Sequence, residues 1–294
     1  MIPCNVIGSY PPVLDKSKYA DAYLSGGMRD PSGEMIRNAV NSQLEAGIDI
    51  ISDGQTRADF ISLFARNFKG VLMQRRPVVV SEIEYKNPVT VEDQEFVRKI
   101  IPKETMLKGI ITGPYTLAKY SENRFYNGTE ELAYAYAEGL NNEARALDGV
   151  VDFIQVDEPE YSIDYPEYAG GLLDTVFKGV SKIRMLHSCG DVSHVFEDMV
   201  ELNVDVLEHE FAANPELLNT VKRIDFKQKL GYGCLRSDKD RVEPVDEVKT
   251  IVRRALDVYP PGKILLNPDC GLRNLPPRVA FQKLRNMVEA RNSL

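Results

Sequence analysis

The sequence predicts an α/β protein folded as a (β/α)8 TIM barrel, and three observations support that prediction. Strand-like apolar runs alternate with helix-like segments eight times along the 294 residues, which indicates parallel strands joined by right-handed crossovers. Polar residues follow six of the eight expected strands, as they do at the carboxyl face of a barrel, where active sites lie. Residues 8–12, after the first strand, lack the glycine-rich turn that an open dinucleotide-binding sheet would need.

Each expected element is a short apolar run or an amphipathic segment bounded by polar, glycine or proline residues. The expected strands cover residues 5–10, 48–54, 106–112, 151–159 with the following loop, 185–191 at the end of the fifth, 204–210, 229–235 and 263–271. The expected helices cover residues 32–46, 56–68, 130–147, 166–182, 192–202, 215–223, 246–258 and 277–291.

Residues 71–104 interrupt the alternation. The apolar residues 77–80 and 89–91 flank a polar stretch there, which predicts an inserted β-hairpin. No linker or internal repeat divides the rest of the sequence. We therefore expect residues 1–294 to form a single domain.

The composition is that of a soluble globular protein, with 43% hydrophobic and 27% charged residues. A net charge of −8 argues against a nucleic-acid partner, because a phosphate-contacting surface needs a concentrated basic patch. No apolar run approaches the length of a membrane span and the N-terminus lacks a signal pattern, so we expect a cytoplasmic protein. The four cysteines do not make a disulfide scaffold in so long a chain and are expected to be free thiols or metal ligands.

A histidine and a cysteine two residues apart, His187 and Cys189, end the fifth expected strand. Residues two apart in an extended segment point to the same side, so this pair can face one metal ion, and the ligand types suit zinc. Two later strand ends offer further ligands, which are Glu210, with Glu208 and His209 as alternatives, and Cys270. The sequence therefore predicts a zinc site made by His187, Cys189, Cys270 and one of Glu208, His209 and Glu210, and with Glu210 the set would be a tetrahedral one of one nitrogen, two sulfurs and one oxygen.

Such a ligand set predicts activation of a thiol. Two thiolates and a carboxylate bring more negative charge than the ion can neutralise, so the site is poorly suited to hydrolysis. It is well suited to keeping a substrate thiol ionised at neutral pH, and Glu210 is the ligand that we expect a thiol to displace. A purely structural zinc site is the alternative, but such sites normally use closely spaced cysteine pairs and no carboxylate.

Six segments resemble the catalytic half of the cobalamin-independent methionine synthases, namely residues 7–11, 111–114, 155–159, 187–189, 205–210 and 267–272. The match runs in order over nearly the whole chain, and the combination of N-P-D-C-G-L with V-D-E-P is specific. In that family the barrel transfers a methyl group to homocysteine bound at zinc. The resemblance implies the zinc ligands His187, Cys189, Glu210 and Cys270, with Asp157 as a further catalytic residue. The residues that it implies in substrate binding are Ile7, Gly8, Ser9, Gln55 and Asp157, the last for the homocysteine ammonium group.

Departures from the family bear on the methyl donor. The second, N-terminal barrel of full-length members has no counterpart here, and Tyr120 stands where the family has a folate-stacking tryptophan. Residues 235–238, after the seventh expected strand, lack the family's proton-donating histidine. In these respects the chain resembles the short "core" methionine synthases, which take the methyl group from a methylcorrinoid. When a methylcorrinoid gives up its methyl group, the corrinoid leaves as Co(I) and takes up no proton, so that donor needs no acid.

We therefore expect a methionine synthase that uses Zn²⁺ to transfer methyl from methylcobalamin, or from a protein-bound methylcorrinoid, to the thiol of L-homocysteine without folate. The expected partners are L-homocysteine and a corrinoid protein. The alternatives are methyl transfer to another thiol such as coenzyme M, folate-dependent methylation of homocysteine, and a non-catalytic thiol- or corrinoid-binding module. Asp157 separates the first of these, because an anionic sulfonate gains nothing from a carboxylate while an amino acid does.

Overall fold

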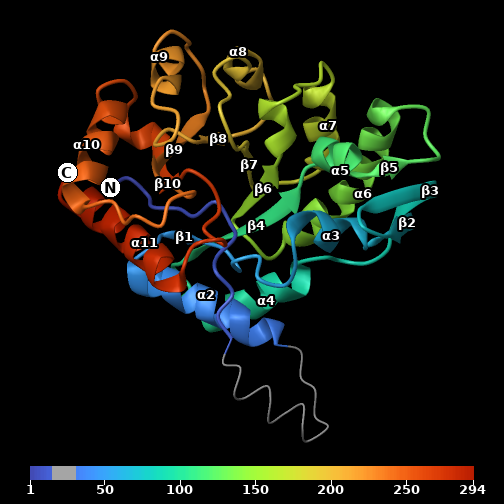
Figure 1. The fold of residues 1–294 in the computed structure, drawn as a ribbon, viewed down its shortest axis with the longest axis horizontal. Helices are drawn as coiled ribbons and strands as arrows, with labels where there is room; N and C mark the ends of the chain where they lie inside the picture. Colours follow the sequence, from blue (N-terminus) through green and yellow to red (C-terminus); the bar gives the residue numbers. More distant parts are fainter. Residues whose placement is uncertain (15–30) are drawn as a thin grey trace, which may run out of the picture.

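A seven-stranded parallel sheet forms the centre of the structure, a computed structural model that describes residues 1–14 and 31–294 (Figure 1). Its strands pair in the order β1-β4-β6-β7-β8-β9-β10, and every pair is parallel. These strands are β1 (Ile50–Ile51), β4 (Met106–Thr112), β6 (Phe153–Asp157), β7 (Ile183–His187), β8 (Val206–His209), β9 (Lys229–Leu235) and β10 (Ile264–Pro268). The α/β class is confirmed.

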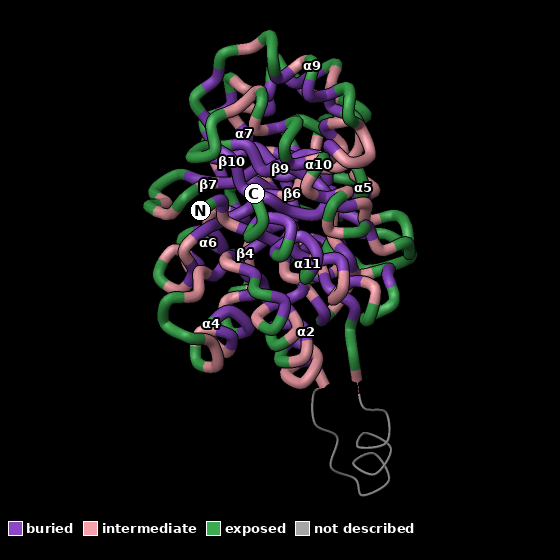
Figure 2. Tube along the Cα trace, turned by 90° about the vertical axis from the view of Figure 1, so that its left-hand side faces the viewer, coloured by how far each residue is buried: buried purple, intermediate pink, exposed green. Residues whose placement is uncertain are grey.

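Helices between successive strands surround this sheet, and the strands form the buried centre of the molecule (Figure 2). The helices are α2 (Ser32–Ala46), α3 (Phe60–Ala65), α4 (Val91–Ile100), α5 (Pro114–Tyr120), α6 (Thr129–Leu147), α7 (Ala169–Val176), α8 (Phe196–Met199), α9 (Leu217–Val221), α10 (Val245–Leu256) and α11 (Pro277–Asn292). Two 3-10 turns are η1 (Pro159–Ser162) and η2 (Pro261–Lys263). Among the described residues, no helix combines the length and the apolar character needed to cross a bilayer.

The N-terminal segment connects the two edges of the sheet. Cys4 forms a parallel bridge with Leu266 of β10, and Asn5 forms one with Ile50 of β1. The expected first strand over residues 5–10 is therefore wrong in extent, because regular pairing stops at Asn5. Beyond Asn5 the chain is held by hydrogen bonds from side chains of the sheet, since Lys108 and Gln155 donate to the carbonyl oxygens of Val6 and Ile7.

The concave side of the sheet carries an apolar layer and a polar layer. The apolar layer consists of Ile50, Phe153, Met185, Val206 and Leu265, with Met106 packed against it. Two residues further along their strands stand the buried residues Lys108, Gln155, His187 and Glu208. Alternate residues of a strand share a face, so the polar layer lies nearer the carboxyl ends of the strands.

The region of the expected hairpin over residues 71–104 differs from the prediction. Strands β2 (Phe68–Met73) and β3 (Pro77–Tyr85) form the antiparallel pair, and β5 (Glu122–Asn123) adds to β3 in parallel. Residues 89–91 form no strand, because Glu143 Oε2 and Oε1 of α6 accept the N–H groups of Val89 and Thr90 at 2.7 and 2.8 Å. The chain then enters α4, whose first turn is acidic and last turn basic, as the helix dipole favours. The expected helix over residues 56–68 is likewise reduced to α3.

Candidate metal centre and substrate cavity

Three of the four predicted metal ligands meet at the carboxyl ends of β7 and β10. His187 is the last residue of β7, Cys189 follows it, and Cys270 follows β10. His187 Nε2 lies 3.0 Å from Cys189 Sγ, and Cys189 Sγ lies 2.7 Å from Cys270 Sγ. All three ligand atoms lie within 4.8 Å of one another. Segments about eighty residues apart in the sequence thus present their donor atoms to one point.

The chemistry of this group fits zinc. Two thiols and one imidazole are the soft and borderline ligands that Zn²⁺ prefers. His187 Nδ1 lies 3.2 Å from the backbone carbonyl oxygen of Glu208. A proton on Nδ1 therefore has an acceptor, which leaves Nε2, on the side of the cysteines, available to a metal ion.

The same contacts shift the pKa values of the two cysteines in opposite directions. Hydrogen bonds from Cys189 and His187 hold the pKa of Cys270 well below its usual range. The pKa of Cys189 is raised because its thiol donates to Cys270 and is buried. Burial alone would lower the pKa of His187, but the hydrogen bond and charge of Cys270 outweigh it and raise this pKa to about 9. The lowered pKa of Cys270 favours its thiolate form, which is the form that binds a metal ion.

The fourth predicted ligand, Glu210, lies beside this group and is not part of it. Among the described residues, only the histidine and the two cysteines have ligand atoms within 4.8 Å of one another. Burial and the charge of Cys270 raise the pKa of Glu210, whose carboxylate accepts the N–H of Gly190. Of the alternatives, Glu208 points into the polar layer, where Asn5 and Lys108 bind it. The His209 ring is buried against Phe196, with ring centroids 5.8 Å apart.

A cavity of about 410 Å³ opens above the metal-ligand group. It is lined by the predicted residues Ile7, Ser9, Gln55, Asp157, His187, Cys189 and Cys270. It is also lined by Ala58, Asp59, Phe60, Pro159, Gly271, Arg273 and Asn274, which the sequence did not point to. Gly8 is not part of the lining that the described residues form. A Cβ atom on Gly8 would lie 2.8 Å from Gln55 Oε1, so glycine lets the Gln55 side chain cover the N-terminal segment.

Asp157, at the end of β6, lines the cavity and is paired with His187 in the register of β6 and β7. Its Oδ1 accepts a hydrogen bond from Gln155 Nε2 at 2.5 Å. Burial raises the pKa of Asp157 to about 6, although the charge of His187 acts in the opposite direction. Near neutral pH the carboxylate is therefore ionised and available to a cation.

Gln55 is held in a backbone conformation that residues with a Cβ atom rarely adopt. Its φ is +45°, the only positive value for a non-glycine residue in the described part of the chain. Arg273 Nη1 donates to Gln55 O at 2.6 Å and to Ala58 O at 3.1 Å, so the loop after β10 anchors the loop after β1. Strained residues that persist are commonly found at functional sites. Arg273 was missed, although it follows the C-G-L segment directly.

Residues 2–293 match the protein family described as the catalytic domain of cobalamin-independent synthase. The chain belongs to this family. It is 36% identical over 307 residues to a methionine synthase of Methanocaldococcus jannaschii, with 97% of each chain covered. It is 32% identical over 314 residues to a methionine synthase of Saccharolobus solfataricus, covering 98% of this chain and 93% of the relative. As a member of the family with these relatives, the chain is a methyltransferase.

Solved structures agree on the fold. A B12-independent methionine synthase from Shewanella sp. W3-18-1, in complex with selenomethionine, superposes with a TM-score of 0.86 at 23% identity, covering 100% of this chain and 97% of the other. A methyltransferase from Methanosarcina mazei gives a TM-score of 0.67 at 16% identity, covering 99% and 94%. At such identities the likeness extends to the arrangement of helices and strands, which is the curled parallel sheet with surrounding helices.

Glu158, in one of the segments that resemble the synthase family, has a structural role. Glu158, beside Asp157, accepts the N–H groups of Tyr115 and Thr116, both at 2.9 Å, and the Thr116 hydroxyl at 2.6 Å. It therefore caps the N-terminus of α5. A Cβ atom on Gly113 would lie 2.1 Å from Glu158 Cδ, so the T-G-P and D-E-P segments fit together only with glycine there. Glu158 therefore follows a strand end at the carboxyl face but does not line the cavity.

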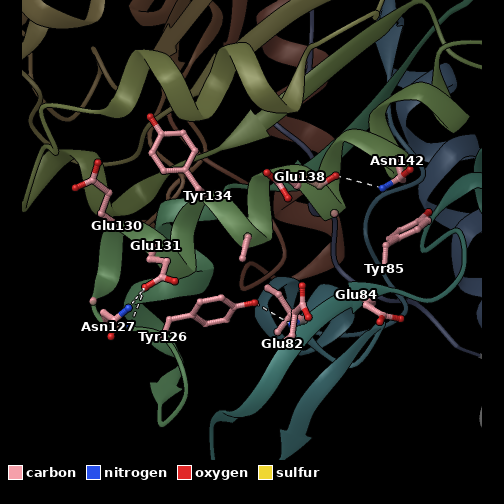
Figure 3. A pocket seen from close by; sticks show the side chains of 14 residues that line it. Glu82, Glu84, Tyr85, Tyr126, Asn127, Glu130, Glu131, Tyr134, Glu138 and Asn142 are labelled. Carbon is pink, nitrogen blue, oxygen red and sulfur yellow. Dashed lines mark hydrogen bonds between the residues drawn. The ribbon is translucent and has the colours of Figure 1, made fainter.

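A larger cavity, of about 790 Å³, lies away from this site between β3 and α6 (Figure 3). Its lining includes Glu82, Glu84, Glu130, Glu131 and Glu138. None of the predicted site residues lines it. The chemistry predicted from the synthase segments therefore belongs to the smaller cavity at the carboxyl ends of the strands.

Proposed function

We propose that this methyltransferase is a methionine synthase that transfers a methyl group to the thiol of L-homocysteine. One observation carries the proposal. A single cavity is lined by three zinc-type ligands, by the carboxylate of Asp157 and by the N-terminal segment at Ile7 and Ser9. A substrate with a thiol at one end and an amino-acid group at the other requires this combination.

In this proposal Asp157 binds the homocysteine ammonium group, since an ionised, half-buried carboxylate on the cavity wall attracts a cation. The backbone of Ile7, Gly8 and Ser9, with Gln55 above it, binds the rest of the amino-acid end. The relatives named methionine synthase support homocysteine as the acceptor. Coenzyme M is disfavoured as the acceptor, because its sulfonate would be repelled by Asp157.

His187, Cys189 and Cys270 are the residues that would hold Zn²⁺. We propose Glu210, which lies outside this group, as the fourth ligand, the one that a substrate thiol would replace. When bound, Zn²⁺ supplies the positive charge that keeps a thiol ionised and nucleophilic at neutral pH. Glu208 orients the His187 ring through its backbone carbonyl. The cavity fixes the amino-acid end of the substrate, which directs its sulfur toward the ligand group.

For the methyl donor we propose methylcobalamin or a protein-bound methylcorrinoid. The chain has three histidines, and His187 is the one that lines the cavity, since His209 is buried in the sheet and His194 is exposed. A methylfolate would need an acid to protonate its amine leaving group, whereas a corrinoid would not. In the loop after β9, where the family has its acidic histidine, Arg236 and Asp238 bind each other at 2.7 Å.

A panel of donors and acceptors tests the proposal. The zinc-loaded full chain is incubated with methylcobalamin or methyltetrahydrofolate as donor, and with L-homocysteine or coenzyme M as acceptor. We expect methionine to form from methylcobalamin and homocysteine, with the other three combinations nearly inactive. Faster transfer from methyltetrahydrofolate would overturn the proposed donor. Faster transfer to coenzyme M would overturn the proposed acceptor.

We further propose that residues 1–294 act as one (β/α)8 unit in the cytoplasm, with the N-terminal segment as the eighth strand position. The parallel bridges from Cys4 to β10 and from Asn5 to β1 support that position. Deleting residues 1–10 would then open the sheet at its seam, and we expect the truncated chain to lose its cooperative thermal unfolding. Retention of the full-length transition would contradict the proposal.

A further inference from the structure

Gln155 connects the two parts of the cavity that the proposed function assigns to the amino-acid end of homocysteine. Its Nε2 amide donates to Asp157 Oδ1 at 2.5 Å and to the carbonyl oxygen of Ile7 at 3.0 Å. The side chain is fully buried, so water does not compete for these bonds. One amide group therefore sets the distance between a carboxylate on β6 and the backbone of the N-terminal segment.

We propose that Gln155 is a positioning residue that makes the cavity selective for thiols that carry an amino-acid group. By holding Asp157 and Ile7 as one unit, it allows the ammonium group and the carboxylate of a single substrate to be bound together. The inference rests on the proposed function and adds to it the residue that determines acceptor specificity.

The N-terminal segment depends on side chains from the sheet for its course. Lys108 Nζ donates to Val6 O, Gln155 to Ile7 O, and Ser52 Oγ to Gly8 O at 2.7 Å. Of these three donors, Gln155 is the one that also binds Asp157. The other two locate the backbone alone, whereas Gln155 relates it to the carboxylate.

The layer in which Gln155 lies also contains a buried ion pair. Lys108 Nζ and Glu208 Oε2 are 3.5 Å apart, and both side chains are fully buried. Asn5 donates to the second oxygen of Glu208. A buried ion pair with these additional bonds resists displacement, because moving either partner would leave an uncompensated charge.

The unused end of the amide supports the assignment. Gln155 Oε1 is buried and has no hydrogen-bond partner among the described residues. A buried acceptor without a partner costs free energy, so an apolar side chain would relieve that cost while removing the two bonds of Nε2. Replacing Gln155 with methionine should therefore alter the cavity more than the stability of the fold.

The test compares Gln155→Met with the wild-type full chain, both zinc-loaded. Isothermal titration calorimetry gives the Kd for L-homocysteine and for propane-1-thiol, which keeps the three-carbon chain but lacks the ammonium and carboxylate groups. We expect the Kd for homocysteine to rise on the order of tenfold, as loss of a hydrogen bond to a charged group would cause. The Kd for propane-1-thiol and the zinc content should stay within about twofold of wild type, because neither depends on the Gln155 bonds.

Gln228→Met is the matched control. Gln228 is also buried, its Nε2 donates to Val200 O and Leu202 O at 2.8 and 3.0 Å, and its Oε1 also has no partner among the described residues. It directly precedes β9, at the end of the sheet opposite the cavity. We expect this variant to bind both thiols as wild type does.

Two results would overturn the inference, namely an unchanged homocysteine preference in Gln155→Met, or an equal loss of affinity for both thiols, as a merely structural role would give. If Gln155→Met does not fold, Gln155→Leu, which also lacks the donor, is judged by the same ratio. The proposed function fails separately, if the wild-type protein itself shows no preference for homocysteine over propane-1-thiol.

Discussion

Ser9 and Gly271 are in contact at the point where the substrate cavity meets the metal-ligand group. A Cβ atom on Gly271 would lie 2.0 Å from Ser9 Oγ. The next residue, Leu272, donates its N–H to Ser9 O at 2.7 Å. The chain that carries Cys270 is therefore packed directly on the backbone that we assign to the amino-acid end of the substrate.

Gly271→Ala should weaken homocysteine binding more than zinc binding. The new methyl group cannot lie 2.0 Å from Ser9 Oγ, so the Ser9 side chain must shift at the cavity wall. We expect KM for homocysteine to rise on the order of tenfold or more, because small misplacements of positioning groups are costly, with the zinc content unchanged. Gly262→Ala is the control, since a Cβ there meets nothing within 4 Å. An unchanged KM in Gly271→Ala would contradict this coupling.

Asp157→Asn should lower the affinity for homocysteine in a pH-dependent way. The pKa of Asp157 is raised by burial to about 6, so the wild-type carboxylate is ionised above that pH and protonated below it. The ratio of variant to wild-type Kd should therefore be largest, on the order of tenfold to a hundredfold, above pH 6 and should shrink as the pH falls below 6. Calorimetry between pH 5 and pH 8 measures this ratio. A ratio near one throughout would mean that Asp157 does not bind the ammonium group.

Loss of zinc should distinguish the three clustered ligands from Glu210. Cys270→Ala removes the thiol with the lowered pKa, and we expect affinity for zinc to fall on the order of a hundredfold or more. In Glu210→Gln the affinity for zinc should fall by less than about tenfold, because Glu210 lies outside the 4.8 Å group. Competition with a zinc chelator measures both, and Cys234→Ala, a buried cysteine outside the cluster, is the control. Equal losses for Cys270→Ala and Glu210→Gln would contradict this order.

Local patterns predicted the regular elements well where the determinants are local. Helix α2 (Ser32–Ala46) ends where predicted because Gly47, with φ +83°, donates its N–H to Gln43 O and Leu44 O. Residues 89–91, Val-Thr-Val, favour a strand by composition, yet they lead into α4. The deciding contact is with Glu143, more than fifty residues away, which no local pattern reveals.

The candidate site divides in the same way. The spacing of His187 and Cys189 is visible in the sequence because residues two apart on a strand share a face. Cys270, Asp157 and the N-terminal residues required the resemblance to a family. Gln155 and Arg273 could not be assigned, since their partners Ile7 and Gln55 are 148 and 218 residues away.

Glu158→Gln provides a test of the α5 cap that is independent of the cavity. Glu158 accepts three donors through two oxygens, and an amide in its place turns one acceptor into a donor that faces an N–H group. At pH 8, where Glu158 is ionised in the folded protein, we expect the free energy of unfolding to fall by about 1–3 kcal/mol, the cost of a buried donor without a partner. Urea denaturation measures this change.

The pH dependence of that difference has a definite sign. Burial raises the pKa of Glu158 to about 7 from its ordinary value of 4.5, so the folded protein holds this proton more tightly than the unfolded chain. Wild-type stability must then decrease as the pH rises from about 4.5 to about 7, because the unfolded chain has fewer protons bound in that interval. Glu158→Gln has no such group. The difference between its free energy of unfolding and that of the wild type should therefore narrow over this interval and stay constant above it. A deficit that widens as the pH rises would show that the three donors hold Glu158 ionised in the folded protein.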